Sequence, residues 1–193
     1  TPDGIITLRA PTEAEAIAME DKQRATRRPQ QEGEQVSGGV FDDGSEELLG
    51  CVITPPPAIL DGDDGWLEIW PGLVDRMLNE VRRLGGYYQG LTPCVEAVSE
   101  AHQAAFGRRA LGFEYAGQKL TARRMTRPEY AAFMANRTST NFWSLVAAVG
   151  KTCLLSHQGE EQQALLQGRP YLAMDLGLKI LDAAAGVAET TAG

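Results

Sequence analysis

The side chains best suited to catalysis or metal binding are few in this sequence and stand far apart. The two histidines, His102 and His157, have no cysteine, aspartate or glutamate at the spacing of a metal-ligand motif. We interpret both as structural or surface residues. Neither a G-x-S-x-G nucleophile motif nor a G-x-G-x-x-G dinucleotide motif occurs. The sequence therefore predicts no catalytic residue and a protein that is not an enzyme.

Two short segments match parts of ligand-binding loops but lack the residues that would complete them. Residues 150–152, Gly-Lys-Thr, match the end of a phosphate-binding loop without its upstream glycine and strand. The acidic turn 61–65 matches the start of a calcium loop, but Gly72 stands where the bidentate glutamate should be. We interpret the turn as solvated, and we expect neither a metal ion nor a cofactor.

Charge and hydropathy exclude two kinds of partner. At a net charge of −8 the chain lacks the basic balance that binding of free nucleic acid requires. Its longest apolar runs, 145–149 and 183–185, fall far short of the roughly 20 residues of a membrane span. The three cysteines are not closely spaced, which favours a reducing compartment over a disulfide framework.

Capping signals and apolar periodicity predict the elements that would position any site. We expect short strands at 5–10 and 112–124, the second being a β-hairpin. The segments with helical spacing are 13–28, 45–53, 71–84, 93–106, 127–135, 142–155, 159–167 and 170–185. The sequence therefore predicts an α+β fold that is mainly α, with short strands.

Several stretches recur in one order along the chain, which predicts an internal duplication. Residues 6–15 and 120–129 each hold a strand followed by a capping box, and they align without a gap. The further matched pairs are 48–52 with 145–149 and 66–73 with 165–172, the latter with a proline at each helix start.

The recurring order implies two diverged strand-plus-helices repeats. We expect one at 1–86 and the other at 112–193, joined by a linker helix within 87–111. One strand and three helices bury little surface alone, so the two copies should share a core or pack side by side.

Aromatic residues at element starts and two apolar residues of the segment 29–44 are candidates for a protein interface, because Trp and other aromatic side chains are favoured at contact hot spots. Packing inside the protein is the alternative. The candidates are Val40, Phe41, Trp66, Trp70, Phe142 and Trp143. Val40 and Phe41 lie in the Gly-rich acidic segment 29–44, which we expect to be mobile in the isolated protein and held by a neighbouring subunit if ordered.

The repeated unit resembles a known family in most of the chain outside 87–111. The residues that carry the resemblance are 120–124, 126–130, 145–149, Leu172 and Asp175, with 6–15, 48–53 and 71–84 in the first copy. In these stretches it resembles the tail assembly chaperones of long-tailed bacteriophages, especially Mu-like and other contractile-tailed phages. A single unit is usual in that family, and a tandem copy departs from it.

The resemblance implies a non-enzymatic phage protein that acts through protein–protein contacts. It would be a tail chaperone, or a neck, tail or baseplate component of the virion. Its partners would be other phage structural proteins in an oligomer or larger assembly, in the host cytoplasm and, for a structural component, in the virion. The alternative is a cellular small-ligand-binding or regulatory module with a pocket between the repeats.

Overall fold

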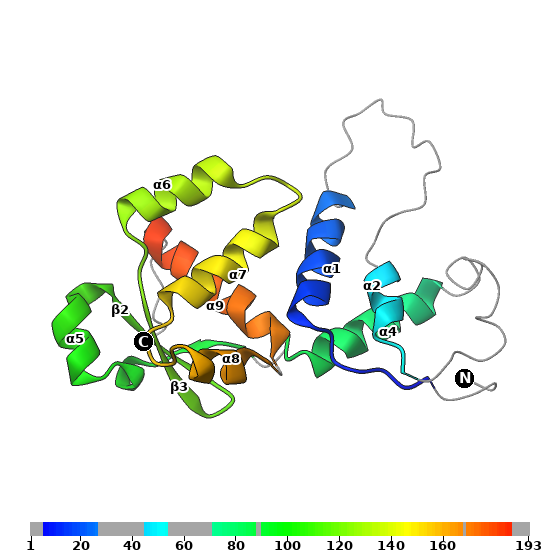
Figure 1. Ribbon diagram of the computed structural model, residues 1–193, viewed down its shortest axis with the longest axis horizontal. Coiled ribbons are helices and arrows are strands. Elements are labelled where there is room, and N and C mark those ends of the chain that lie inside the picture. Colours follow the sequence, from blue (N-terminus) through cyan, green and yellow to red (C-terminus); the bar gives the residue numbers. More distant parts are fainter. Residues whose placement is uncertain (1–5, 27–44, 54–70, 88–89, 168, 187–193) are drawn as a thin grey trace, which may run out of the picture.

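A computed structural model describes residues 6–26, 45–53, 71–87, 90–167 and 169–186, and Figure 1 shows their arrangement. Helices form most of the described chain, beside one small antiparallel sheet. The α+β class predicted from the sequence is confirmed. The interface candidates Val40, Phe41, Trp66 and Trp70 lie outside the described residues, as does the segment 29–44.

The described part of the first unit holds one β-bridge and three helices. These are α1 (Glu13–Thr26), α2 (Ser45–Gly50) and α4 (Pro71–Leu84). Their shared core comprises the buried side chains of Met19, Leu48, Cys51, Met77, Leu78 and Val81. Helix α2 ends three residues earlier than the expected 45–53, because residues 51–53 turn back to run beside the chain that precedes α1.

The strand expected at 5–10 is wrong in extent. Among its described residues, 6–10, Leu8 alone pairs, in an antiparallel bridge with Val52. Backbone hydrogen bonds flank the bridge, from Arg9 N to Cys51 O (2.9 Å) and from Ile53 N to Thr7 O (2.8 Å).

The helix expected over 93–106 is wrong in its first half. Residues Thr92–Pro93 form β1, Val95–Ala97 a 3-10 turn (η2), and helix α5 spans only Glu100–Phe106. The Ser99 hydroxyl accepts from His102 N and begins the helix there, not at Thr92. A second 3-10 turn, η3 (Gly107–Arg109), leads into the sheet. The stretch expected to be a linker helix therefore supplies an edge strand, where a proline without an amide hydrogen is tolerated.

The hairpin expected at 112–124 is confirmed. Strand β2 (Ala110–Tyr115) pairs with β3 (Gln118–Arg123), and β1 pairs with β2 in the order β1-β2-β3. The two turn residues, Ala116 (φ 48°) and Gly117 (φ 77°), both have positive φ. Two positive φ angles give the turn the twist that suits a tight antiparallel hairpin.

Four helices complete the second unit. They are α6 (Arg127–Asn136), α7 (Phe142–Cys153), α8 (Glu160–Gln167) and α9 (Pro170–Ala185), all near the positions expected from the sequence. Helices α7 and α9 cross closely through two glycines. A Cβ on Gly150 would lie 2.0 Å from the Ala173 carbonyl oxygen, and one on Gly177 would lie 2.0 Å from that of Val146. Only glycine permits backbones this close.

The two units meet where α1 lies against α7 and α9 (Figure 1). Ala16 of α1 is fully buried there among Ala147, Tyr171, Ala173 and Met174. Glu13 of α1 forms an ion pair with Lys151 of α7. The first unit therefore shares a core with the second through one face of α1, one of the two arrangements expected for the repeats.

Candidate functional site

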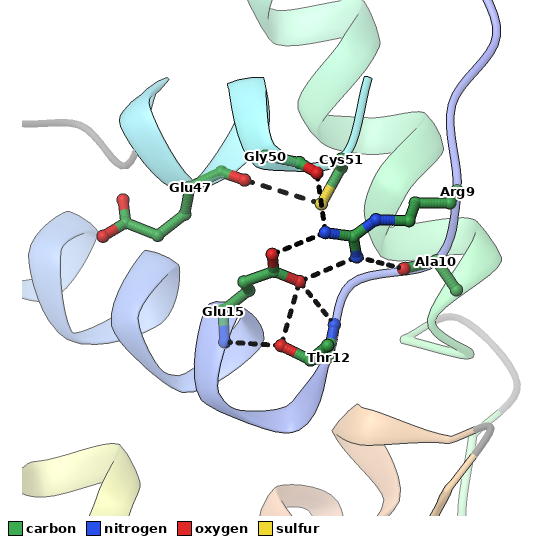
Figure 2. Close-up of polar contacts among 7 residues, drawn as sticks. All are labelled: Arg9, Ala10, Thr12, Glu15, Glu47, Gly50 and Cys51. Carbon is green, nitrogen blue, oxygen red and sulfur yellow. Dashed lines mark hydrogen bonds and ion pairs between the residues drawn. The ribbon is translucent and has the colours of Figure 1, made fainter. Parts of the chain in front are cut away.

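Helix α1 begins at a polar cluster that we call the first lock, defined by Arg9, Thr12 and Glu15 (Figure 2). The Arg9 guanidinium donates to both carboxylate oxygens of Glu15, at 2.9 and 2.7 Å. Glu15 Oε2 also accepts from Thr12 N at 2.7 Å, while Glu15 N donates to Thr12 Oγ1 at 3.3 Å. The hydrogen bonds from Arg9 and Thr12 lower the pKa of Glu15 to about 2. The capping box expected at Thr12 is confirmed and carries an additional arginine.

Helix α6 begins at a second lock with the same parts, defined by Arg123, Thr126 and Glu129. The Arg123 guanidinium donates to both carboxylate oxygens of Glu129, at 2.9 and 2.8 Å. Glu129 Oε2 accepts from Thr126 N at 2.7 Å, and Glu129 N donates to Thr126 Oγ1 at 3.4 Å. The hydrogen bond from Arg123 is the main reason that the pKa of Glu129 falls to about 2. The second expected capping box is confirmed as well.

The backbone around the two locks also matches. In the second unit Ala122 forms an antiparallel bridge with Leu154, and Leu155 N donates to Thr121 O at 2.7 Å. These contacts stand at the same places, relative to Thr126, as the Leu8 bridge and its flanking bond do relative to Thr12. Each lock therefore fixes the angle at which a helix leaves a bridged extended segment.

The bridges correct one part of the expected alignment. They place 51–53 opposite the first extended segment and 153–155 opposite the second. The equivalent of 48–52 is therefore not 145–149 but 150–154. Buried Cys51 and Cys153 then occupy equivalent positions, and burial raises the pKa of each thiol, that of Cys51 to about 11. Both thiols are held protonated near neutral pH and act as small apolar side chains.

The two units differ where the helix that begins at the lock, α1 or α6, faces the helix that follows it, α2 or α7. In the first unit Lys22 of α1 and Glu47 of α2 bridge the groove between these two helices with an ion pair of 2.8 Å. Counted from the capping threonine, Asn136 stands in α6 where Lys22 stands in α1. Counted back from the buried cysteine, Val149 stands in α7 where Glu47 stands in α2. The second unit therefore has no ion pair at this position.

An open apolar hollow of about 220 Å³ occupies the corresponding place between α6 and α7. Helix α6, which forms one side of the hollow, lies on the side of the second unit away from α2 and α4 (Figure 1). Its lining is mostly hydrocarbon: Met125, Glu129, Ala132, Phe133, Asn136, Leu145, Ala148, Val149, Thr152 and Cys153. Because Glu129 is engaged by the second lock, Asn136 and Thr152 are the polar side chains at this groove that the lock does not use.

The part of the chain that carries the second lock and one side of this groove is rich in basic residues. Residues 106–140 hold seven arginines and lysines against two glutamates, in a chain whose net charge is −8. Arg109, Arg124 and Arg127 are exposed, and none of them forms an ion pair within the described part of the chain. Arg109 and Arg123 act electrostatically on the thiol of Cys153 in the groove. The local charge is thus opposite to that of the whole protein.

Two of the six interface candidates, Phe142 and Trp143, lie at the start of α7, where both are half-buried against other parts of the same chain. The Arg24 guanidinium lies 3.8 Å from the centre of the Phe142 ring, which also meets Phe133 edge-on at 6.2 Å. Trp143 N donates to the Asp21 carboxylate at 2.9 Å, so α1 caps α7. In this structure both aromatic residues join the two units.

The arginines of the locks were missed by the sequence reasoning, although a signal for them exists. Paired basic residues predict exposed surface charge, yet Arg123 is largely buried and Arg9 is bonded across the bridge to Gly50 O at 2.6 Å. Each arginine stands three residues before the capping threonine in the gap-free alignment of the two repeats. That shared position could have identified both.

The two histidines remain apart. His157 Nδ1 lies 2.9 Å from Ser156 Oγ, which itself accepts from Thr121 N at 3.0 Å. No group of three or more potential metal ligands occurs among the residues the structure describes. Within the same residues, no helix has both the length and the apolar character needed to cross a bilayer.

Comparison of the chain with protein-family models, with curated proteins and with solved structures gives no match.

Proposed function

We propose that this protein is a non-enzymatic phage assembly or virion protein that works through protein–protein contacts. The main observation is the pair of matched locks, which start a helix in the same way in each half of the chain. The stretches that resemble tail assembly chaperones include both locks. The proposal covers a tail chaperone in the host cytoplasm and a neck, tail or baseplate component.

The matched locks support an origin of the two halves by duplication. The agreement extends over the guanidinium pair, the capping box and the bridge, and the bonds of the guanidinium pair and the capping box use the same atoms in both halves. After duplication, one copy is free to keep a structural role while the other acquires a binding surface. The Lys22–Glu47 ion pair in the first unit and the open groove at Asn136 and Val149 in the second fit such a division of roles.

The alternative, a small-ligand module with its pocket between the repeats, has less support. Where α1 meets the second unit, buried side chains fill the boundary, among them Ala16, Tyr171 and Met174. The α6–α7 groove lies within one unit and is open along its length on the surface, as Ala132 and Ala148 are exposed. An open apolar groove suits a protein segment better than an enclosed metabolite.

Mass spectrometry of purified virions tests the proposal and divides its two forms. A virion component is present in stoichiometric copies, whereas a chaperone is absent from finished particles but co-purifies with tail proteins from lysates. A chain encoded with no viral genes around it, and found in neither fraction, would contradict both forms.

A further inference from the structure

We propose that the groove between α6 and α7 docks an acidic amphipathic helix of a partner protein. This inference rests on the proposed function, because it names the surface through which the chain makes protein–protein contacts. Three observations carry it: the size and lining of the groove, its contrast with the first unit, and the charge around it.

The groove has the dimensions of a site for apolar side chains. A cavity of about 150 Å³ lined by hydrocarbon can hold a benzene-sized molecule, and the volume here is about 220 Å³. Phe133 and Cys153 form its buried floor, while Ala132 and Ala148 form its exposed edges. One or two large side chains of a partner would remove this apolar surface from water, the main favourable term in association.

The fold does not require the groove to be open. The first unit has the same lock and the same buried cysteine, yet there Lys22 of α1 and Glu47 of α2 form an ion pair between the two helices. In the second unit Asn136 and Val149 replace that pair. The exposed apolar surface is therefore a property of these residues and not of the architecture, and such surface marks an interaction site.

The shape and charge of the site select the occupant. Two neighbouring helices form a groove that a third helix fills with side chains at i, i+3, i+4 and i+7. Arg124 precedes Met125 of the lining, Arg127 begins α6, and Arg109 acts electrostatically on Cys153 in the groove. None of the three has an ion-pair partner in the described chain. Carboxylates flanking the apolar stripe of the incoming helix would meet these arginines, which gives orientation and a faster association.

Fluorescence anisotropy with designed peptides tests the inference on the full-length protein. The probe is a labelled helical peptide with leucine along one face and glutamate on the other positions. Its control has the same leucines with lysine in place of glutamate. We expect the acidic peptide to bind at least about tenfold more tightly than the basic one, with affinity falling as salt rises. Equal binding of both peptides, or binding of neither, would overturn the proposal.

A pair of matched variants locates the binding site. Asn136→Lys with Val149→Glu rebuilds in the second groove the ion pair of the first, so the substituted pair has a precedent in the same fold. We expect this variant to weaken binding of the acidic peptide at least about tenfold. Lys22→Asn with Glu47→Val opens the first groove and should leave that binding unchanged. If the variant with Asn136→Lys and Val149→Glu bound the acidic peptide with wild-type affinity, the placement of the binding site in this groove would be refuted.

Two further measurements keep the result decisive. Ala148→Glu adds a carboxylate at the exposed edge of the groove and should also weaken binding, even if the double variant folds poorly. Analytical sedimentation of the unliganded wild-type protein and of the variant with Asn136→Lys and Val149→Glu shows whether a second copy of the chain fills the site. Self-association that the closed groove abolishes would replace the acidic partner helix with a self-interface.

Failure of this inference can be told apart from failure of the proposed function. If the closed-groove variant still co-purifies with phage tail proteins, the chain is an assembly protein that uses another surface. If the acidic peptide binds the groove but no phage protein associates with the chain, the docking site stands and the phage assignment fails.

Discussion

The second lock makes a quantitative prediction about stability. Replacing Glu129 with alanine removes the carboxylate that accepts from Thr126 N and from both guanidinium nitrogens of Arg123. Replacing Arg123 with alanine removes the ion pair and a long hydrogen bond to Arg124 O but leaves the capping box intact. A double-mutant cycle with both single variants and the double variant isolates the energy of the pair.

The magnitude follows from burial and geometry. The pKa of Glu129 falls from 4.5 to about 2, and at 1.36 kcal/mol per pKa unit the full shift would correspond to roughly 3 kcal/mol. The Glu129 side chain is 38% exposed, however, so water screens the pair, and we expect a coupling of about 1 kcal/mol. Loss of the cap adds about 1 kcal/mol, so Glu129→Ala should cost about 2 kcal/mol in total.

Urea denaturation at several pH values measures this coupling. Because the folded-state pKa of Glu129 is lowered, its stabilisation is present above pH 4.5 and is lost as the pH falls toward about 2. The matched cycle on Arg9 and Glu15 should give a coupling of the same sign and similar size, since that pair has the same geometry. A coupling below about 0.3 kcal/mol in either unit would refute the reasoning, because that is within the additivity error of independent sites.

Two further predictions concern the second unit. Gly177→Ala should lower the free energy of unfolding, measured in urea, by at least about 2 kcal/mol, because the added Cβ would lie 2.0 Å from the Val146 carbonyl oxygen. This clash should outweigh the better helix propensity of alanine, which is worth about 1 kcal/mol. Desolvation raises the pKa of Asp175 from 3.8 to about 6, although nearby Lys179 opposes the shift. The unfolded chain therefore loses this proton at lower pH than the folded protein, and the free energy of unfolding should decline as the pH rises from 3.8 to about 6. Asp175→Asn should abolish this decline, and an unchanged pH profile of unfolding would show that Asp175 is not its source.

The capping boxes and the hairpin could be predicted because their signals are local. Thr12 and Thr126 each have a glutamate three residues later, and the hydrogen bonds that follow involve only those neighbours. Ala116 and Gly117 between two β-prone runs determine the hairpin in the same way. Local chemistry was sufficient wherever the partner atoms lie within a few residues.

The segment around Thr92 shows why other expectations failed. Thr92-Pro93 suits both the start of a helix and an edge strand, and pairing with Glu114, distant in sequence, decides between them. Ser99 then supplies the helix cap that Thr92 was expected to provide. The open groove could not be predicted for a related reason. The contrast between Lys22–Glu47 and Asn136–Val149 becomes visible only when the bridges fix the alignment of the two units.

If the proposed function is correct, the gene for this chain lies in a phage or prophage genome, and deleting it there tests the central claim most directly. The measurement is the yield of infectious particles, with electron microscopy of the lysate to show which parts assemble. We predict that heads accumulate without functional tails and that the wild-type chain restores particles in trans. The variant with Asn136→Lys and Val149→Glu should not restore them. Complete, infectious particles in normal yield without the chain would contradict the assignment to phage assembly.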